Sequence, residues 1–336
     1  MSALLPTQKR NLPLLATRET CAGKTYIVTG ANTGLGFEAA KHLASLGAAK
    51  VILAVRNPVA GEAAKRQIDE AAKTTASVCV VEVWPLDLSS YDSVRAFARR
   101  AAAELDRIDA LIENASIALE QRETAEGHLK TVTVNVLGTY LLASLLLPEM
   151  SRQAKSGRLD RFQPRVVIIG STVGFDSKEG WEKIKEDPIK GMDEFEPVYV
   201  TYPLTKLTES FATRHLAREL LPVEKTGVII NLVCPGLCVT QLGRNLSEER
   251  MAHLREVQAK FGRTAEDGSR TLLHGAVAGV ESHGKFLRSC EDGESAVPEW
   301  VKEDLALQKN TWDVIAKELE AIEPGCVTKM LACAGN

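Results

Sequence analysis

Two patterns of apolar and polar positions alternate along the chain. Short runs rich in Val and Ile, without a polar residue at every second position, are typical of strands buried on both faces. They predict six strands, at about 25–28, 50–55, 77–84, 110–113, 165–169 and 227–233. Longer stretches with helical spacing predict the helices between and beyond them, at about 37–46, 59–72, 90–105, 127–150, 202–221 and 300–319.

Strands buried on both faces and separated by helices form a parallel sheet with helices on each side. Because strand–helix–strand crossovers are right-handed, we expect an α/β, doubly wound Rossmann fold that binds ligands at the carboxyl ends of its strands. No Gly/Ser/Pro-rich linker or internal repeat divides the chain. The sequence therefore predicts one domain over 23–290, an N-terminal arm over 1–22 and a helical C-terminal extension over 291–336.

Two segments interrupt the alternation of strands and helices. Residues 175–200 form a charged insertion with a possible short helix at 178–185, and residues 241–284 form a mostly helical region. One interpretation of both segments is solvated decoration. Since each follows the carboxyl end of a predicted strand, the other is that they shape a substrate pocket, with 241–284 as its lid.

Composition and charge restrict the class of protein. The formal net charge of −3 provides no basic field for nucleic acid and no polybasic segment for anionic lipid. The most apolar stretch, 141–148, is too short to span a bilayer, and the arm lacks the apolar core of a signal peptide. Seven scattered cysteines show no zinc-like spacing. We expect free thiols, no metal site, a cytoplasmic location and a small molecule as the partner.

A glycine-rich turn lies between the first strand and its helix, and it reads Thr29-Gly30-Ala31-Asn32-Thr33-Gly34-Leu35-Gly36. Glycines allow a sharp turn and a close approach of backbone to ligand, and a helix N-terminus offers free N–H groups and a positive dipole end. The turn therefore predicts a phosphate site. Its expected cofactor contacts are Gly30, Asn32, Thr33, Gly34, Leu35 and Gly36. The alternative is tight packing of strand against helix with no ligand.

Arg56 follows the second strand, where an acidic residue would bind the free hydroxyls of an adenine ribose. The residue before it is Val55 rather than Asp, and a guanidinium can donate two hydrogen bonds to a phosphate. The position therefore favours NADP(H) over NAD(H). The alternative is a solvated arginine at the end of a strand.

Three residues with acid–base chemistry are expected to meet at the ligand end of the sheet. Ser171 follows the strand at 165–169, and Tyr202 and Lys206 share one face of the next helix. A nearby ammonium favours the phenolate, so Lys206 is expected to lower the pKa of Tyr202. Tyr202 would then exchange a proton with a carbonyl or alcohol oxygen that Ser171 orients, while Lys206 also holds a nicotinamide ribose.

These motifs together resemble the short-chain dehydrogenase/reductase family, and the match extends over about 24–240. The resemblance implies a nicotinamide cofactor and Ser171, Tyr202 and Lys206 as catalytic residues. It adds Asn135, which would order a relay water. It also implies cofactor contacts at Asp87, Leu88, Asn114, Ala115, Tyr202, Lys206, Pro235, Gly236 and Thr240.

Within the family, the end of the second strand and the long C-terminal part are similar to retinol-dehydrogenase-like and WW-domain-oxidoreductase-like members. Residues 262–285 resemble fungal relatives that tailor secondary metabolites. These likenesses imply a mainly apolar substrate.

Three departures from the family pattern stand out. Ser116 replaces a glycine beside the cofactor, and Glu113 stands where many members carry an asparagine. Ser171 and Tyr202 are 31 positions apart, whereas about a dozen is common in the family. The extra residues fall in 175–200, and such a segment can cover the helix face used for dimerisation. A homo-oligomer is therefore possible, but the usual one is in doubt.

The preferred hypothesis is an NADP(H)-dependent oxidoreductase that acts on a ketone or secondary alcohol. A second hypothesis is a nucleotide-binding sensor or scaffold without redox turnover, and a third is a non-redox cyclase or isomerase on the same fold. Consumption of NADPH that depends on substrate separates the first from the others.

Overall fold

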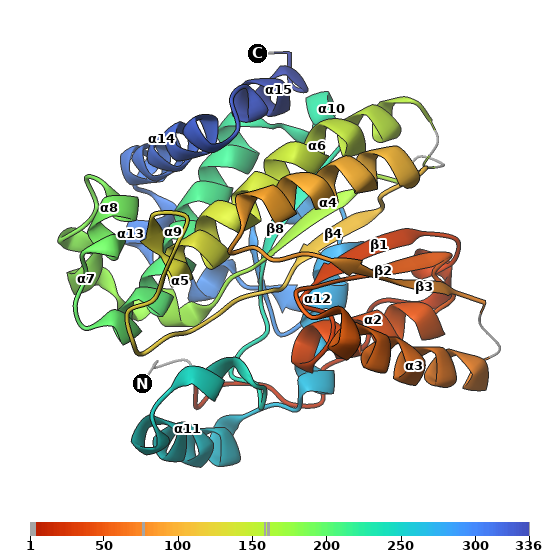
Figure 1. Ribbon diagram of the computed structural model, residues 1–336, viewed down its shortest axis with the longest axis horizontal. Helices are drawn as coiled ribbons and strands as arrows, with labels where there is room; N and C mark the ends of the chain where they lie inside the picture. Colours follow the sequence, from red (N-terminus) through yellow and green to blue (C-terminus); the bar gives the residue numbers. More distant parts are fainter. Residues whose placement is uncertain (1–4, 76–77, 158, 160–161, 336) are drawn as a thin grey trace.

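The core of the computed structural model, which describes residues 5–75, 78–157, 159 and 162–335, is an eight-stranded sheet (Figure 1). Its order is β10-β9-β8-β7-β4-β1-β2-β3, and all neighbours are parallel except β9 and β10. The strands are β1 (Thr25–Thr29), β2 (Lys50–Val55), β3 (Val80–Pro85), β4 (Ala110–Glu113), β7 (Arg165–Ile169), β8 (Ile229–Cys234), β9 (Phe286–Arg288) and β10 (Glu291–Asp292). This sheet confirms the predicted doubly wound Rossmann fold. The predicted start of the third strand, Ser77, lies outside the described residues.

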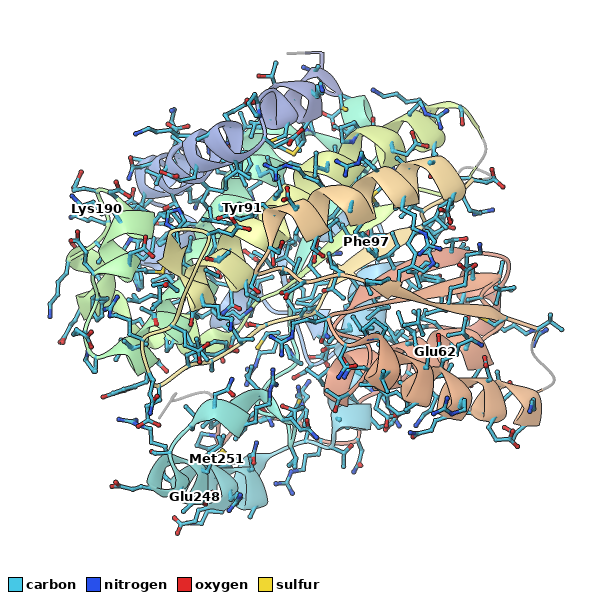
Figure 2. All side chains as sticks on the ribbon, in the orientation of Figure 1. Glu62, Tyr91, Phe97, Lys190, Glu248 and Met251 are labelled. Carbon is cyan, nitrogen blue, oxygen red and sulfur yellow. The ribbon has the colours of Figure 1, made fainter. Side chains whose placement is uncertain are left out.

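Helices cover both faces of the sheet and enclose two apolar cores. One face carries α4 (Tyr91–Glu104), α6 (Thr139–Lys155) and α9 (Thr201–His215). The other carries α2 (Gly34–Ser45), α3 (Pro58–Thr74) and α12 (Ala265–Val277). Buried side chains of α4, such as Tyr91 and Phe97, fill the space above the sheet (Figure 2). Strand order reverses between β1 and β4, which is where doubly wound folds open a crevice.

The helix predicted over 127–150 begins later and is not uniform. A hairpin of β5 (Thr124–Ala125) and β6 (His128–Leu129) comes first, and Gly127 has the positive φ of 88° that its turn requires. Helix α5 (Lys130–Val132), the π-helix η1 (Thr133–Gly138) and α6 then follow without a break. This 26-residue run is long and apolar enough to span a membrane, but 89% of its most apolar window is buried inside the protein. It is therefore a core helix of this fold.

The C-terminal part contains two strands that the sequence did not predict. Strands β9 and β10 pair through 286–292, so the predicted boundary at 290/291 falls inside a hairpin. Beyond it lie α13 (Glu299–Lys302), α14 (Leu305–Ile322) and α15 (Cys326–Ala332). Helix α14 packs on α9 and α15 packs on α6, as the blue helices in Figure 1 show.

The charged insertion packs mainly on helices rather than over the ligand end of the sheet. It contains α7 (Lys178–Glu182), α8 (Pro188–Asp193) and the 3₁₀ turn η3 (Val198–Val200). Trp181 is buried with its ring centroid 4.9 Å from that of Phe211 on α9. Asn310 of α14 donates a hydrogen bond of 2.8 Å to the carbonyl of Lys185. The insertion is thus part of a second layer together with the C-terminal helices.

Most of the N-terminal arm runs beneath the lid region before α1 (Arg18–Cys21), and its residues 1–4 lie outside the described part. The Gln8 amide donates to the Leu237 carbonyl at 2.9 Å and accepts from the Leu237 N–H at 2.8 Å. The N–H of Leu12 donates to Asp267 at 2.6 Å. Short elements complete the chain: η2 (Thr172–Asp176), η4 (Leu216–Leu220), α10 (Val223–Thr226), η5 (Leu242–Asn245), α11 (Glu248–Phe261), η6 (Val280–Ser282) and η7 (Glu294–Ala296).

Candidate active site

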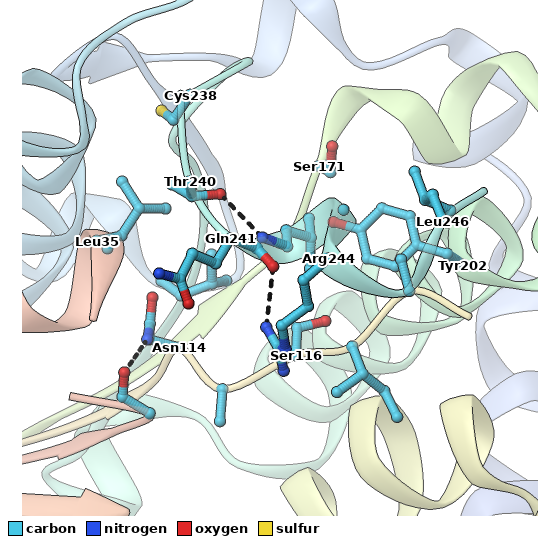
Figure 3. A pocket seen from close by; sticks show the side chains of 18 of the residues that line it. Leu35, Asn114, Ser116, Ser171, Tyr202, Cys238, Thr240, Gln241, Arg244 and Leu246 are labelled. Carbon is cyan, nitrogen blue, oxygen red and sulfur yellow. Dashed lines mark hydrogen bonds between the residues drawn. The ribbon is translucent and has the colours of Figure 1, made fainter. Parts of the chain in front are cut away.

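A cavity of about 1040 Å³ opens at the carboxyl ends of the central strands. The glycine turn and the segment after β8 form two of its walls, while η5 and α11 lie across its mouth. Every catalytic or cofactor residue predicted from the sequence lines this cavity except Gly36 and Asn135. Figure 3 shows ten of the lining side chains by name.

The glycine turn has the geometry of a phosphate cradle. Gly30 and Gly34 have positive φ angles of 65° and 58°, which side chains with a Cβ rarely adopt. A Cβ on Gly36 would lie 2.5 Å from the Nδ2 of Asn114, so this glycine permits close packing behind the turn. The Thr33 side chain makes no capping bond to α2, which leaves N–H groups of the first turn for an anion. The residues therefore fit the diphosphate of a dinucleotide.

Asn114 and Asp87 hold the loops around this cradle. The Asn114 amide donates to the Thr29 carbonyl at 2.8 Å, and the Ala115 N–H donates to the Thr29 hydroxyl at 2.9 Å. The Asp87 carboxylate accepts from the Ser89 N–H at 2.9 Å and from its hydroxyl at 2.6 Å. Asp87 and Asn114 thus have structural bonds and still face the cavity.

Two arginines meet at one end of the cavity, and the sequence indicated only one of them. Arg56 follows β2, and Arg244 extends from η5 (Figure 3). Neither forms a salt bridge within the described residues, and Arg244 donates to the Gln241 carbonyl at 3.0 Å. Burial and the nearby charge of Arg56 lower the pKa of Arg244. Two unpaired cations that repel each other make this end of the cavity suited to an anion. No signal in the sequence marks Arg244, because its nearness to Arg56 depends on how the lid folds.

Ser171, Tyr202 and Lys206 lie together on one wall of the cavity. Ser171 follows β7 and accepts a hydrogen bond of 3.3 Å from the Val173 N–H, while Tyr202 and Lys206 share the first turns of α9. The Lys206 ammonium lies 5.8 Å from the centroid of the Tyr202 ring. The positions expected from the spacing are therefore found, with a phenol and a hydroxyl facing the same space (Figure 3).

The charge around Tyr202 differs from the expectation. Lys206 donates to the Ile169 carbonyl at 2.8 Å and to the Glu209 carboxylate at 2.9 Å. Burial and the negative charge of Glu209 raise the pKa of Tyr202 above its usual value. Burial is the main cause of this upward shift, so the predicted lowering of the Tyr202 pKa by Lys206 is not found in this arrangement, in which Lys206 is paired with Glu209. The sequence reasoning missed Glu209, although its place three residues after Lys206 puts both side chains on one helix face.

Asn135 lies in the π-helix η1, a distortion that is common at functional sites. Its amide donates to the Ile117 carbonyl at 3.0 Å and to the Thr205 hydroxyl at 3.1 Å, and it accepts from the Ile117 N–H at 2.9 Å. The side chain does not line the cavity and joins the loop after β4 to α9. Asn135 therefore positions neighbouring residues, and the predicted relay role stays a prediction.

The lid is narrower than the predicted range of 241–284. Residues of η5 and α11 line the cavity, whereas α12 is a core helix that packs against α2 and the sheet. Glu120 joins the lid to the loop after β4, because its carboxylate accepts from Ser247 and, at 3.1 Å, from Arg250. The Arg250 guanidinium lies 3.5 Å from the ring centroid of Tyr199, which lies at the end of the insertion. The insertion therefore reaches the cavity only at its end.

Several other polar side chains near the site are held by structural contacts. His283 accepts from the Ile230 N–H at 3.1 Å and does not line the cavity. Cys238 lines the cavity but is 8% exposed, and burial raises its thiol pKa to about 12, which favours packing over redox chemistry. The Ser116 hydroxyl is buried without a hydrogen-bond partner among the described residues. No group of three potential metal ligands occurs in the described ranges.

Comparisons with known proteins show to which protein family the chain belongs. The sequence profile of the short chain dehydrogenase family matches residues 24–183. The short chain dehydrogenase/reductase dmxR8 of Cryptosporiopsis sp. is 39% identical over 309 residues, which cover 90% of this chain and 93% of the relative. The short chain dehydrogenase atnD of Emericella nidulans is 39% identical over 270 residues, with 78% and 82% covered. The chain therefore belongs to the short-chain dehydrogenase/reductase family of oxidoreductases, which confirms the resemblance found in the sequence.

Solved structures show the same fold. A 3-oxoacyl (acyl-carrier-protein) reductase from Agrobacterium tumefaciens with NADP bound aligns with a TM-score of 0.61 at 21% identity, covering 82% of this chain and 96% of that one. A short-chain dehydrogenase from Sphingobium yanoikuyae in complex with NADPH aligns with a TM-score of 0.57 at 22% identity, covering 89% and 95%.

Proposed function

We propose that the protein is an NADP(H)-dependent oxidoreductase that interconverts a ketone and a secondary alcohol on a mainly apolar small molecule. The observation that carries this proposal is the convergence of Ser171, Tyr202 and Lys206 on the cavity that the glycine turn closes at its other end. Family membership supports the reaction class.

The chemistry follows from the groups in the cavity. A bound nicotinamide supplies or accepts the hydride. In reduction, Ser171 donates a hydrogen bond to the substrate carbonyl oxygen, and Tyr202 gives this oxygen a proton as the carbonyl carbon becomes an alcohol carbon. Lys206 stabilises the phenolate that remains until solvent returns the proton. Oxidation uses the same groups in reverse.

The preference for NADP(H) rests on the two arginines. Arg56 and Arg244 offer two unpaired cations at one end of the cavity, which suits the 2′-phosphate of NADP(H). A titration of the purified protein with NADPH and with NADH, followed by intrinsic fluorescence, tests this preference. Tighter binding of NADPH supports it, and equal binding or tighter binding of NADH contradicts it.

The apolar substrate class rests on the lining near the lid. The residues that line the cavity include the apolar side chains of Leu119, Leu246, Leu254 and Val257. We expect a cyclic or aromatic ketone of secondary metabolism, and a cytoplasmic location in keeping with the seven free cysteines. Screening such ketones for NADPH consumption tests the function. Binding of NADPH without turnover would favour a sensor or scaffold, and turnover of substrate without NADPH consumption would favour a cyclase or isomerase.

A further inference from the structure

The helix that carries the acid–base residues also carries a buried carboxylate that the proposed reaction does not require. Tyr202, Lys206 and Glu209 follow one face of α9 at helical spacing. The Lys206 ammonium and the Glu209 carboxylate are 2.9 Å apart, with side chains 4% and 2% exposed. Moving two charges out of water costs free energy, which their mutual attraction offsets only when the geometry is favourable. A pair in this place therefore calls for a functional explanation.

The first effect of Glu209 is geometric. An ammonium has three N–H donors, and Lys206 uses two of them for Glu209 and the Ile169 carbonyl, at 2.9 and 2.8 Å. Both acceptors are fixed, because Glu209 lies on α9 and Ile169 ends β7. The third donor is left for the cavity, which Lys206 lines. Glu209 thus fixes the direction in which the ammonium acts.

The second effect is electrostatic. A lone ammonium in a low-dielectric interior would strongly favour the phenolate form of a neighbouring tyrosine. Burial raises the pKa of Glu209 to about 7, so its carboxyl is ionised mainly above that pH. In the ionised form it lies 2.9 Å from the Lys206 ammonium, and Tyr202 then faces an ion pair of zero net charge, whose field falls off faster than that of a single charge.

We propose that Glu209 is a positioning residue that fixes Lys206 and cancels its charge, so that Tyr202 rests as a neutral phenol. The proposal rests on the function proposed above. A tyrosine that starts neutral is ready to donate a proton to a carbonyl oxygen, whereas alcohol oxidation requires it to start ionised. The site is therefore biased toward carbonyl reduction.

The groups around this pair agree with a cluster of zero net charge. Glu113 at the end of β4 is 3% exposed, its Oε2 accepts from the Thr29 hydroxyl at 3.4 Å, and its Oε1 has no partner among the described residues. Burial and the charge of Glu209 raise the pKa of Glu113 well above its usual value, which favours the neutral carboxyl. Two further titratable groups near Tyr202 and Glu209 are Tyr140 and Cys238, and burial raises the pKa of both above the usual value, which favours their neutral forms.

The test follows ionisation of Tyr202 by tyrosinate absorbance in the protein without cofactor. The signal of Tyr202 is the difference between each protein and the same protein carrying Tyr202→Phe. Because Glu113 is a second buried carboxyl whose pKa depends on Glu209, both proteins carry Glu113→Gln, and the comparison is between Glu113→Gln and the double variant Glu113→Gln/Glu209→Gln.

We expect Tyr202 to ionise at least one pH unit lower in the double variant, a tenfold or greater change in its acidity. Glu209→Asp, which keeps the charge, should restore the behaviour of the parent. Unchanged ionisation of Tyr202 in the double variant overturns the proposal. If the glutamine variant does not fold, Glu209→Met removes the same charge with a side chain of similar length.

A kinetic measurement gives a second readout. The ratio of kcat for reduction to kcat for oxidation is compared at about pH 8.5, where wild-type Glu209 is ionised because its pKa is about 7. In Glu209→Gln this ratio should fall at least tenfold, and the pH profile of oxidation should move to lower pH. An unchanged ratio contradicts the bias. The titration needs no turnover, so absence of any NADPH-dependent activity in the wild-type protein would overturn the proposed function and leave the titration to decide on Glu209.

Discussion

At the scale of single residues, the reaction depends on the proton of Tyr202, which lies in the first turn of α9 and faces the cavity. Tyr202→Phe keeps the ring and removes the proton donor. We expect kcat for reduction to fall by about 100- to 10,000-fold, with binding of NADPH retained. The measurement is steady-state NADPH oxidation beside a fluorescence titration with NADPH. Tyr91→Phe is a matched control, because its buried hydroxyl has no partner among the described residues and lies on α4, outside the cavity lining. Near-normal turnover by Tyr202→Phe would refute the acid–base assignment.

Cofactor choice is a second property of single residues. Arg56→Ala should weaken binding of NADPH by about 1.5–3 kcal/mol, or roughly 10- to 150-fold, and leave binding of NADH nearly unchanged. Arg244→Ala should act in the same direction, since both guanidinium groups serve one anion. Arg66→Ala on α3 removes the same charge outside the cavity lining and should change neither constant. Equal weakening of NADPH and NADH by Arg56→Ala would show that the arginine does not read the 2′-phosphate.

Residues in short motifs were predictable from the sequence, and those defined by tertiary contacts were not. Short local motifs contain the glycine turn, Ser171, Tyr202 and Lys206. Their spacing relative to the predicted strands was therefore enough to predict that they lie at one edge of the sheet. The role proposed for Arg244 could not be predicted, because Arg244 comes near Arg56 only in the folded protein. The charge balance around Tyr202 was not predicted for the same reason. From the sequence, Lys206 was paired with Tyr202, and the contact between Lys206 and Glu209 was not included.

At the scale of elements, a histidine joins three segments that are distant in sequence. The Nδ1 of His128 on β6 lies 2.7 Å from Asp193 of α8, and its Nε2 lies 3.9 Å from Glu318 of α14. These carboxylates raise the pKa of His128 above its usual value, with the Asp193 hydrogen bond as the main cause. A raised pKa means that the folded protein binds the proton more tightly than the unfolded chain does. The stabilisation is therefore full below about pH 6.5, the unfolded value, and is lost as pH rises through the folded value.

His128→Gln tests this linkage. We expect the variant to be less stable than wild type at about pH 5.5, by on the order of 1 kcal/mol, and the difference to shrink by about pH 9. Urea unfolding of both proteins at the two pH values measures it. A difference that stays constant or grows with pH would show that the ion pair does not stabilise the fold.

The elements show where periodicity works as a guide. Mainly apolar runs of four to six residues form strands β1, β2, β4, β7 and β8. The sequence predicted the ends of these strands to within a few residues. Strand β9 covers only Phe286–Arg288, and two residues with positive φ, Ser289 and Cys290, follow it directly. A run this short has no measurable period, so only its pairing with β8 defines it. The true start of the helix predicted at 127 likewise depends on a hairpin turn rather than on helical spacing.

At the scale of the whole molecule, the C-terminal helices pack on the outside of helices that cover one face of the sheet. Trp312 of α14 is 2% exposed and packs edge-on to Tyr140 of α6 at 6.0 Å, and Ile315 and Leu319 are fully buried. Residues of α14 and α15 therefore cover the faces of α9 and α6 on which they pack.

We accordingly expect a monomer of 36.5 kDa in light scattering coupled to size exclusion. Trp312→Ala should cost about 3–5 kcal/mol of stability, because it leaves a cavity between α14 and α6. A dimeric mass for the intact protein would show that another surface mediates assembly.

The threading of the N-terminal arm under the lid bears on how this enzyme can be re-engineered. Leu5 lines the cavity, and a Cβ on Gly236 would lie 2.3 Å from the Oε1 of Gln8, so the arm and the segment after β8 are fitted to each other. A chimera that imports the lid of a relative without its arm would pair mismatched surfaces at the cavity mouth. The arm and the lid therefore form one structural unit, although they are distant in the sequence. A chimera designed to change substrate specificity should take both segments from the same relative.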